Sequence, residues 1–402
     1  MKNIYHSDIY KFNSPVKSYW EDNSQENLNL EKLTKDVKSE IVVIGGGYTG
    51  LLCAINLIEN HNLDVILVEA GKIGWGASSR NAGFNCLPPS KMSFKKMQSI
   101  YGNDETKKFY KNSVEGSNYT KDIIKEYNID CDVTGNSNYV VAHHPNKFEQ
   151  IKEQAKAYKN EFEIETEVYS KEEFNQIGHG GTEQYGAFSY KPGFAINPLK
   201  FVNGIAKHAL SKKLKIFEHT KVDQINKDNG SYLLKTKEGS IRSKKIVVAT
   251  NGFYQEGLIP KMDGRVLPVI SNIIVTRKLN DDELNAHNFK TFSPIANTKN
   301  LLYYYRKLPD NRILFGTRGD LSGSDQSNLD MSKKMEKFLK DIFPKWSNIN
   351  IEYNWRGLIA LSQKLTPSIG KIDNEEIYYG FGYNGVGVSA APWTGKQLSK
   401  LV

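Results

Sequence analysis

A glycine-rich segment, Gly45-Gly46-Gly47-Tyr48-Thr49-Gly50, restricts the possible folds of this chain more than any other part of the sequence. It follows the apolar run 40–44, which is typical of a buried parallel strand, and apolar residues at helical spacing come after it. A second apolar run at 64–68 completes a strand–helix–strand unit of about 30 residues. The sequence therefore predicts a βαβ unit with the glycines at its first turn.

The Gly-x-Gly-x-x-Gly spacing predicts a dinucleotide site, because each glycine has its own physical role. Gly45 permits a tight turn, Gly47 lets the backbone approach a pyrophosphate, and Gly50 lets the helix pack closely on the strand. The helix N-terminus adds free N–H groups and a positive dipole end. The alternative is a glycine-rich turn that binds no ligand.

Two features after the turn indicate an extended cofactor. Glu69 ends the second strand, where a carboxylate accepts hydrogen bonds from ribose hydroxyls and repels a 2′-phosphate. The segment 74–83 is small, polar and flexible, and no crossover helix follows it promptly, so it can run along a cofactor and offer backbone amides. An ordinary surface loop is the alternative for this segment.

Composition limits the class of protein. The 402 residues suffice for two domains, and a net charge of +9 comes mainly from scattered Lys. This charge is typical of a solvated surface, and attraction to an acidic partner such as tRNA is the alternative. Three cysteines form neither a metal cluster nor an even disulfide framework, and no signal peptide or membrane span is visible. We expect a cytoplasmic protein without a metal.

The rest of the chain alternates between helical and strand patterns. The segment 91–194 has a mainly helical and polar pattern, with one apolar stripe over 148–162 and a capping box at Ser170, and 198–210 is a further helix. Residues 221–250 alternate as strands around turns at 229–230 and 238–239, and 245–249 is expected to rejoin the first sheet. Further strands are expected over 266–318 and 377–380, with helices at 331–343 and at the end of the chain.

Seven segments give the chain a family resemblance. It resembles the D-amino-acid-oxidase-like (DAO) superfamily of FAD-dependent oxidoreductases, in the branch of γ-glutamylputrescine, glycine and sarcosine oxidases, and above all the γ-glutamylputrescine-oxidase-like members. The segments, in the family's order along the chain, are Ser18-Tyr19-Trp20, 42–51, 69–70 with 73–83, 247–252, 304–306 with 312–316, Trp355-Arg356-Gly357 and 382–388.

The resemblance implies an α/β fold in which a Rossmann-like FAD-binding domain of the glutathione-reductase type is interleaved with an α+β substrate domain built on an antiparallel sheet. We expect residues 1–90, 195–265 and 350–402 in the FAD-binding domain, and residues 91–194 and 266–349 in the substrate-binding domain. The resemblance also implies that FAD is bound by Gly45, Gly47, Tyr48, Thr49, Gly50, Glu69, Ala70, Gly76, Ala77, Ser78, Arg80, Asn81, Ala82, Gly83, Val222, Ala249, Thr250, Asn251, Gly252, Gly357, Gly385, Val386, Gly387 and Val388.

Departures from relatives bear on how the flavin is held. Relatives that attach FAD covalently use a His where this chain has Arg80, or a late Cys, and no Cys follows Cys131. We therefore expect non-covalent FAD. A final helix near 389–392 would point its positive end at the flavin pyrimidine ring and favour the reduced state. Sarcosine oxidases bind substrate with a Lys where this chain has Ser389.

The catalytic candidates are Arg306, Tyr304 and Arg80. In a strand over 303–306, Tyr304 and Arg306 share one face, which can line a substrate cavity. Because only eight of the 54 basic residues are Arg, Arg306 is expected to bind a substrate carboxylate through its planar fork, with Arg80 and Arg318 as other choices. An ion pair in domain packing is the structural alternative. The pair at 143–144 is expected to end a strand, not to bind metal.

The sequence thus predicts FAD-dependent oxidation of a C–N bond in an amino acid or modified amine, of the γ-glutamylputrescine, glycine or sarcosine type. The imine product would be hydrolysed, and O2 or a quinone would reoxidise the flavin. Three alternatives stay open. They are a tRNA-modifying flavoenzyme of the same fold, a dehydrogenase that passes electrons to a quinone, and a flavin-binding protein without amine turnover.

Overall fold

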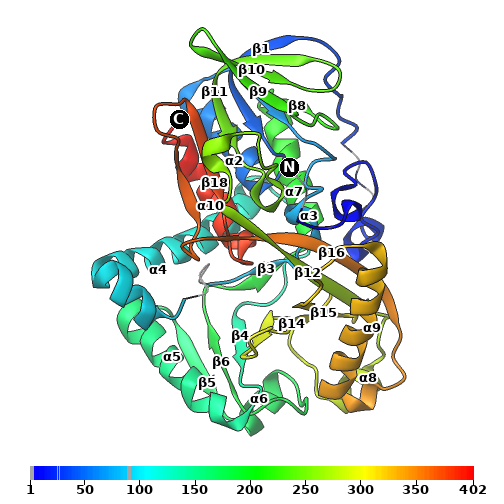
Figure 1. Cartoon of the computed structure of the whole chain (residues 1–402). Helices are drawn as coiled ribbons and strands as arrows, with labels where there is room; N and C mark the ends of the chain where they lie inside the picture. Colours follow the sequence, from blue (N-terminus) through cyan, green and yellow to red (C-terminus); the bar gives the residue numbers. More distant parts are fainter. Residues whose placement is uncertain (1–3, 25, 27, 88–91) are drawn as a thin grey trace.

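The computed structural model describes residues 4–24, 26, 28–87 and 92–402, and it contains two large β-sheets (Figure 1). The first sheet fills the upper part of the view in Figure 1 and the second sheet the lower part. The domain boundary expected between residues 90 and 91 lies outside the described residues. The chain passes between the two sheets several times, as the interleaved pattern of the sequence predicted.

The first sheet contains the glycine-rich turn. Its order is β17-β18-β11-β1-β2-β8, with β18, β11, β1, β2 and β8 parallel, β17 antiparallel at one edge and a β9–β10 hairpin beside β11. Ile41 pairs with Lys245, which confirms that 245–249 rejoins this sheet. The strands are β1 Val37–Ile44, β2 Val65–Val68, β8 Lys215–Phe217, β9 Gln224–Asp228, β10 Ser231–Lys235, β11 Ser240–Val248, β17 Ser368–Lys371 and β18 Ile377–Phe381.

Both faces of the first sheet are covered, which explains why its central strands are apolar throughout. Ile41 and Val43 face a core formed with helices α2 (Tyr48–His61), α7 (Pro198–Ser211) and α10 (Gly387–Ser399). Val42 and Ile44 face the opposite core, which includes residues from β10 and from the segment 258–262.

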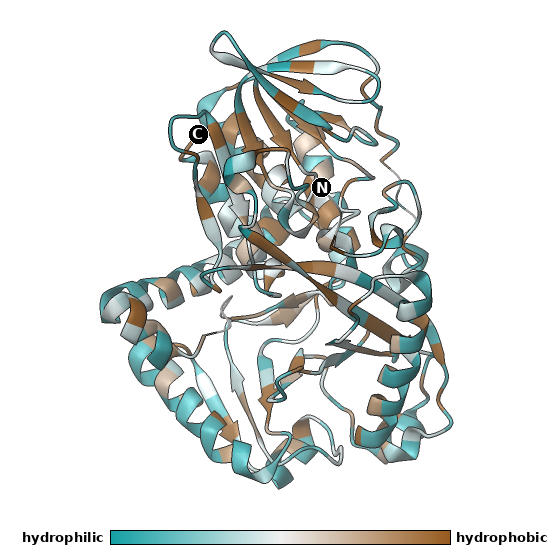
Figure 2. Ribbon diagram, viewed as in Figure 1, coloured by the Kyte–Doolittle hydropathy of each residue, from teal (hydrophilic) through white to brown (hydrophobic). Residues whose placement is uncertain are grey.

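The second sheet is antiparallel except where β13 pairs with β4. Its order is β16-β12-β15-β14-β13-β4-β6-β5. Helices α5 and α9 lie along its outer sides and are mostly hydrophilic, whereas hydrophobic residues concentrate on the strands (Figure 2). The elements are β4 Asn138–Val141, α5 Phe148–Phe162, β5 Thr166–Tyr169, β6 Ala187–Tyr190, β12 Val266–Thr276, β13 Ile295–Asn297, β14 Tyr304–Lys307, β15 Ile313–Arg318, α9 Asp325–Ile342 and β16 Ile351–Ser362.

Three details differ from the sequence expectation. The strand β16 was expected with the FAD-binding part, but it pairs with β12 along almost its whole length and so belongs to the second sheet. The segment 92–194 is mainly helical, as expected, but three short strands that the sequence pattern did not indicate, β4, β5 and β6, lie between or after its helices. Helix α4 (Phe94–Glu126), which is kinked at Gly102, packs against α10, so part of the expected substrate domain completes the core of the first sheet.

Two local features that the sequence predicted, a helix cap and a hairpin turn, are present in the structure. Ser170 and Glu173 form the expected capping box at α6 (Lys171–Ile177). Asn229 and Gly230 have φ angles of 47° and 76°, as a tight hairpin requires. The remaining short elements are η1 Ser7–Tyr10, α1 Tyr19–Asp22, α3 Ala77–Arg80, β3 Phe84–Asn85, η2 Pro145–Lys147, β7 Phe194–Ala195, η3 Asn251–Phe253, η4 Pro260–Met262, α8 Asp281–Ala286 and η5 Pro344–Trp346.

No helix among the described residues combines the length and apolar character that a membrane crossing requires. Among the same residues, no group of three or more His, Cys, Asp or Glu is arranged to hold a metal ion. His143 instead follows strand β4 and contacts the Thr298 hydroxyl through Nδ1 at 2.7 Å.

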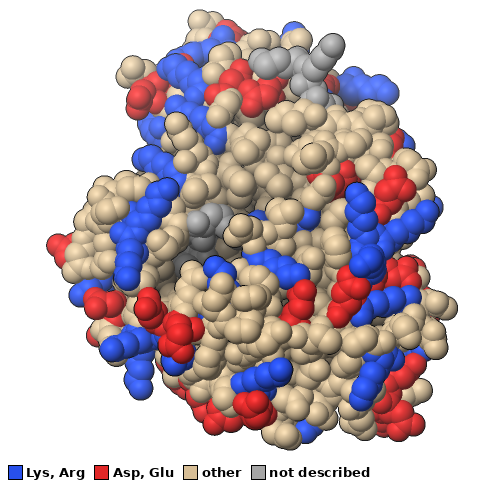
Figure 3. All heavy atoms as spheres, turned by 60° about the horizontal axis from the view of Figure 1, so that its bottom comes forward, with Lys and Arg blue, Asp and Glu red and all other residues tan. Residues whose placement is uncertain are grey.

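Charged side chains of both signs are interspersed on the face that Figure 3 shows. Ion pairs among the described residues join basic and acidic side chains, such as Lys200 with Asp132 and Lys227 with Glu375. The excess of Lys therefore does not gather into one basic patch on this face, which fits the interpretation of a solvated surface.

His179 is a polar group in the core of the second sheet. It is fully buried, its Nδ1 accepts a hydrogen bond from the Gly181 N–H, and its Nε2 lies 2.8 Å from the Tyr305 hydroxyl. Since Nδ1 is an acceptor, Nε2 carries the proton and donates to Tyr305. Burial lowers the pKa of His179 to about 3, so the ring is neutral in the folded protein near neutral pH.

We expect His179 to make the protein less stable in acid. The unfolded chain binds a proton at this residue below about pH 6.5, whereas the folded chain does so only near pH 3, so stability falls as the pH drops through that window by up to about 1.4 kcal/mol per pH unit. Denaturant unfolding at pH 7.5 and pH 5 should show a smaller loss for His179→Gln than for the wild type. The exposed variant His61→Gln should keep the full loss, and an unchanged slope in His179→Gln would contradict the assignment.

Candidate functional site

A cavity at the carboxyl ends of the parallel strands of the first sheet contains about 1240 Å³ of empty space, part of which is open to solvent. Its lining residues follow β1, β2 and β11 directly and come from the loop after β18, which is where open α/β sheets bind ligands. Of the predicted cofactor residues, it is lined by Gly45, Gly47, Tyr48, Thr49, Glu69, Ala70, Gly76, Ala77, Ser78, Asn81, Val222, Ala249, Thr250, Asn251, Gly385 and Gly387.

The other predicted cofactor residues are not among those that line the cavity. They are Gly50, Arg80, Ala82, Gly83, Gly252, Gly357, Val386 and Val388. Gly83 is closely packed: it has a φ of 77°, and a Cβ there would lie 1.9 Å from the Ile196 carbonyl oxygen. Sequence reasoning missed Phe12, Ile44, Val68, Trp75, Thr220, Lys221, Phe253, Gln255, Leu258, Ile359, Ala360, Tyr383 and Ala391.

The glycine-rich turn has the geometry that its spacing predicted. Gly45 has a φ of 114°, and a Cβ there would lie 2.7 Å from the Ala249 carbonyl oxygen. A Cβ on Gly50 would lie only 1.9 Å from the Gly45 carbonyl oxygen, so larger residues at either position would separate α2 from the sheet. Gly47 is the N-cap of α2 and supplies no side-chain cap. The Tyr48 N–H donates to Ser78 Oγ at 3.1 Å, and the start of the helix lines the cavity.

Glu69 lies at the end of β2, and its carboxylate is fixed by the backbone. Oε2 accepts a hydrogen bond from the Gly46 N–H at 2.7 Å, and Oε1 accepts one from the Gly71 N–H at 2.9 Å. Burial raises the pKa of this carboxyl, and these backbone donors partly oppose the rise. The two bonds leave lone pairs of a carboxylate free to accept from ligand hydroxyls in the cavity.

The N-termini of two long helices meet at the cavity. Thr49, in the first turn of α2, lies 2.5 Å from the Tyr383 hydroxyl through Oγ1 and also donates to the Ala391 carbonyl of α10. Helix α10 begins at Gly387 without a side-chain cap. Both helices therefore direct positive dipole ends at the same space, which suits an anionic, extended ligand.

The segment 75–83 is held in place by side chains behind it. Trp20 donates from Nε1 to the Asn81 carbonyl, and Trp355 donates from Nε1 to the Arg80 carbonyl. Arg80 is buried, its guanidinium lies 4.0 Å from the centre of the Trp75 ring, and it donates to the Trp75 and Arg356 carbonyls. Burial lowers the pKa of Arg80 to about 9. Arg80 thus braces this segment and does not itself line the cavity.

One buried polar atom in the lining has no partner. Thr250 Oγ1 is inaccessible and forms no hydrogen bond with any described residue, although Thr250 lines the cavity directly after β11. Such atoms are costly when they stay unpaired, and a bound ligand is one way to satisfy them. The Thr250 hydroxyl lies beside the glycine-rich turn, where the sequence predicted that the cofactor diphosphate binds.

Aromatic residues close another part of the cavity. Phe12, Trp75 and Phe253 form a cluster with ring centroids 4.9–6.2 Å apart, and all three line the cavity. The Trp75 indole is fixed by a hydrogen bond from Nε1 to the Ser14 carbonyl. No sequence signal could have indicated Phe12, because it lies in a polar N-terminal segment and reaches the cavity only through tertiary folding.

The predicted catalytic residues on β14 occupy two environments. Tyr304 lies on the face of the second sheet where its hydroxyl is 2.9 Å from Ser271 Oγ. Arg306 is 1% exposed, donates from Nη2 to the Ile196 carbonyl, and lies over the Trp20 ring. Burial lowers its pKa to about 9, and its Nε and Nη1 have no partner among the described residues. Neither side chain lines the large cavity.

The fold and the cavity together define a dinucleotide-binding α/β protein. Residues at four strand ends line the cavity, and two helix N-termini point into it. The buried Thr250 hydroxyl in its lining has no hydrogen-bond partner among the described residues. These features fit a large anionic cofactor such as FAD.

Comparison with known proteins identifies the family. The profile of the FAD dependent oxidoreductase family, DAO, matches residues 40–401. The chain therefore belongs to this family, and its cofactor is FAD.

The sequences of individual oxidoreductases are similar to nearly the whole of this chain. The sequence is 27% identical to probable oxidoreductase OrdL of Haemophilus influenzae, over 98% of this chain and 89% of that protein. It is also 27% identical to gamma-glutamylputrescine oxidoreductase of Escherichia coli, over 96% of this chain and 89% of that protein. Among solved structures, glycine oxidase from Geobacillus kaustophilus has the same fold, with a TM-score of 0.74 at 17% identity, covering 90% of this chain and 94% of that one.

We expect the FAD to be released intact when the protein is denatured. The described residues that line the cavity include no His or Cys, the side chains expected to form a covalent flavin link. Acid precipitation should therefore leave all of the yellow colour in the supernatant, measured by visible absorbance. Flavin that stays with the pellet would contradict this prediction.

Glu69→Ala should weaken FAD binding. A hydrogen bond that involves a charged group contributes about 1.5–3 kcal/mol, so the Kd for FAD should rise roughly 10- to 150-fold. Titration of the apoprotein with FAD, followed by flavin fluorescence, measures this change.

A matched control is Glu218→Ala, because Glu218 is also a buried carboxylate that accepts a backbone hydrogen bond, from the Ile73 N–H, but it does not line the cavity. Equal losses in the two variants would show that Glu69 acts only by shaping the backbone.

Proposed function

We propose that this chain uses FAD to oxidise a C–N bond of an amine or amino acid to an imine, which water then hydrolyses. The observation that carries this proposal is the match to gamma-glutamylputrescine oxidoreductase, which extends over 96% of this chain. A family member that matches only in the cofactor-binding part would leave the substrate domain unaccounted for. Here the likeness includes the second sheet as well.

Bound FAD supplies the hydride acceptor of such a reaction. The chain has to bind the cofactor, hold the amine against it and exclude water. We assign cofactor binding to the predicted residues that line the cavity, with Glu69 at the ribose and the helix N-termini at the diphosphate and the pyrimidine ring. The N-terminus of α10 would stabilise negative charge that develops on the ring during reduction.

The second sheet forms the other wall of the reaction space. Ile359 and Ala360 of β16 line the cavity and are apolar, so they can keep water from the reacting bond. Tyr304 and Ser271 supply hydroxyls on the same side of the sheet. We assign the substrate to the space between these strands and the Gly385 loop.

Arg80 and Arg306 differ in the contacts that their guanidinium groups make. Arg80 is engaged by two carbonyls and the Trp75 ring, so we propose that it positions the segment 75–83. Arg306 retains two nitrogens without a partner among the described residues, but it lies behind Gly83, where a Cβ would be 3.1 Å from its Nη2. The expected bond between Arg306 and a substrate carboxylate therefore requires a ligand to enter this packed region.

Oxygen and a quinone both stay open as the oxidant that regenerates the flavin. Basic and acidic side chains are mixed on the face shown in Figure 3, so this face does not favour a nucleic-acid substrate.

Anaerobic mixing of the FAD-loaded protein with a panel of amines tests the proposal. We expect at least one amine to remove the visible absorbance of oxidised flavin, since hydride transfer reduces it. The panel should pair carboxylate-bearing amines, such as glycine, sarcosine and γ-glutamylputrescine, with methylamine and putrescine. Dithionite serves as the positive control. Bleaching by dithionite but by none of the amines would overturn the proposal.

A further inference from the structure

Arg318 carries a guanidinium that has no assigned role in the proposed function. It is the last residue of β15, and it pairs across the ladder with Ser271 of β12. Tyr304 of β14 pairs with Gly316, two residues before Arg318, so its side chain shares this face of the sheet. Three neighbouring strands thus bring Ser271, Tyr304 and Arg318 together.

This cluster lies against the cofactor cavity at the Gly385 loop. Gly385 has a φ of 93°, and a Cβ there would lie 2.8 Å from Arg318 Nη2 and 3.8 Å from Ile359 Cδ1. Gly385 and Ile359 both line the cavity. The absence of a side chain at Gly385 therefore leaves room for the guanidinium at the cavity edge.

The Arg318 guanidinium has no hydrogen-bond or ion-pair partner among the described residues. All eight Arg belong to that part of the chain, and Arg318 differs in this respect from the other seven. Those seven each donate at least one hydrogen bond from the guanidinium. Arg318 is partly buried, and burial lowers its pKa. A partly buried charge without a counter-ion is destabilising, so a site of this kind favours an anionic ligand.

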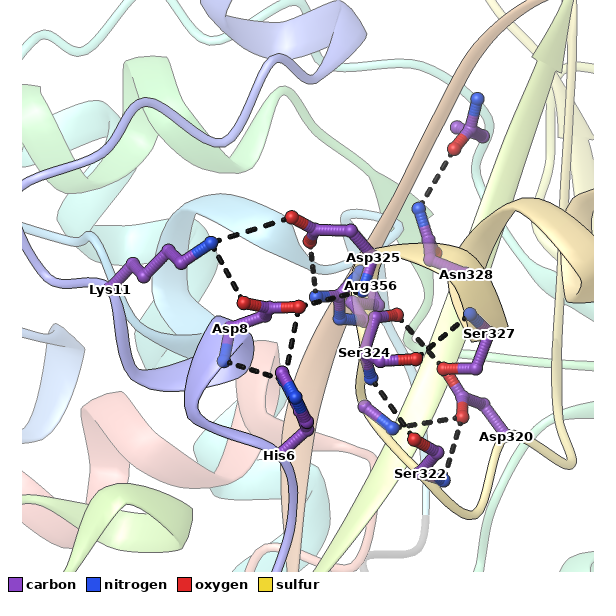
Figure 4. A network of polar contacts seen from close by, with 12 residues as sticks. His6, Asp8, Lys11, Asp320, Ser322, Ser324, Asp325, Ser327, Asn328 and Arg356 are labelled. Carbon is purple, nitrogen blue, oxygen red and sulfur yellow. Dashed lines mark hydrogen bonds and ion pairs between the residues drawn. The ribbon is translucent and has the colours of Figure 1, made fainter.

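The nearest acidic residues along the chain are already engaged (Figure 4). Asp320 is buried and accepts hydrogen bonds from the N–H groups of Ser322 and Gly323 and from Ser327 Oγ. Asp325 accepts from Arg356 Nη2 at 2.8 Å and also faces Lys11. Neither carboxylate is available to neutralise Arg318.

We propose that Arg318 binds the carboxylate of the amine substrate at the Gly385 end of the cavity. The planar fork of its guanidinium offers two parallel N–H donors to a carboxylate. The Tyr304–Ser271 hydroxyl pair lies beside it and supplies a further donor. This inference rests on the proposed function, and it replaces Arg306 as the carboxylate anchor. Neither guanidinium lines the cavity, but Arg306 is fully buried over Trp20, whereas Arg318 is only partly buried and approaches the lining residue Gly385.

The test compares the FAD-loaded wild type with Arg318→Met, Arg318→Lys and a control, Arg277→Met. Arg277 directly follows the last residue of β12 and is ion-paired with Glu283. Its replacement therefore removes a guanidinium without changing the cluster of Ser271, Tyr304 and Arg318. Acetate is titrated into each oxidised protein against chloride at equal ionic strength, with the flavin difference spectrum as the readout. The values of kcat/KM are then measured for a carboxylate-bearing amine that reduces the wild type and for its decarboxylated counterpart.

We expect Arg318→Met to weaken acetate binding and to lower kcat/KM for the carboxylate-bearing amine by about 10- to 150-fold, the effect of losing a hydrogen bond to a charged group. Its kcat/KM for the decarboxylated amine should change far less. Arg318→Lys should fall between the wild type and Arg318→Met because it keeps the charge but loses the fork. Arg277→Met should behave as the wild type.

Two results would overturn the proposal, namely unchanged acetate affinity in Arg318→Met and equal losses on both amines. If the equal losses were accompanied by a changed flavin midpoint potential, the guanidinium would instead be placed at the flavin carbonyls. If no amine reduces the wild type, the proposed function fails, and the acetate titration still decides whether Arg318 binds a carboxylate. If the wild type oxidises only amines without a carboxylate, the proposed function stands and the anchor is refuted.

Discussion

The close packing of α2 and α10 is the constraint on which the cofactor site depends. A Cβ on Gly395 would lie 2.6 Å from the Thr49 carbonyl oxygen, and a Cβ on Gly50 would lie 1.9 Å from the Gly45 carbonyl oxygen. The two helices therefore rest on each other and on the sheet with backbone in direct contact. Both N-termini consequently open at the same edge of the sheet, where their dipoles add and where N–H groups are free for phosphate and ring oxygens. A larger residue at Gly50 or Gly395 would separate these ends.

The second constraint is the long ladder between β12 and β16. These strands pair from Val266 with Ser362 to Thr276 with Ile351, and they carry the second sheet across to the cavity. The register of this ladder puts Ile359 at the cavity and Gly357 against Arg80. The same sheet positions β15 so that its last residue reaches the Gly385 loop. The two sheets are separate ladders, and the buried cluster around Trp20 and Trp355 packs β12, β15 and β16 of the second sheet against Ala82 in the segment 75–83.

Scarcity of arginine makes the environment of each guanidinium informative. Most of the eight are held by carboxylates or carbonyl oxygens, and so serve packing, as Arg80 and Arg312 do. Arg306 is buried with a single carbonyl acceptor and the face of Trp20. Arg318 has neither acceptor nor counter-ion among the described residues, and the acidic residues that follow it are engaged elsewhere. Residue type alone could not separate these four, because the difference lies in which acceptors the fold brings near each one.

The sequence by itself determined the features that depend on local backbone geometry. The glycine turn, Glu69 at the end of β2, the segment 75–83 and the capping box at Ser170 follow from residue types at fixed short spacings, and most of the predicted cofactor residues do line one cavity. Only the tertiary structure decided which sheet β16 joins, that Phe12 and Tyr383 reach the cavity, and which arginine is left unpaired. Those outcomes depend on contacts between residues tens to hundreds of positions apart, and neither hydrophobic periodicity nor motif spacing encodes such contacts.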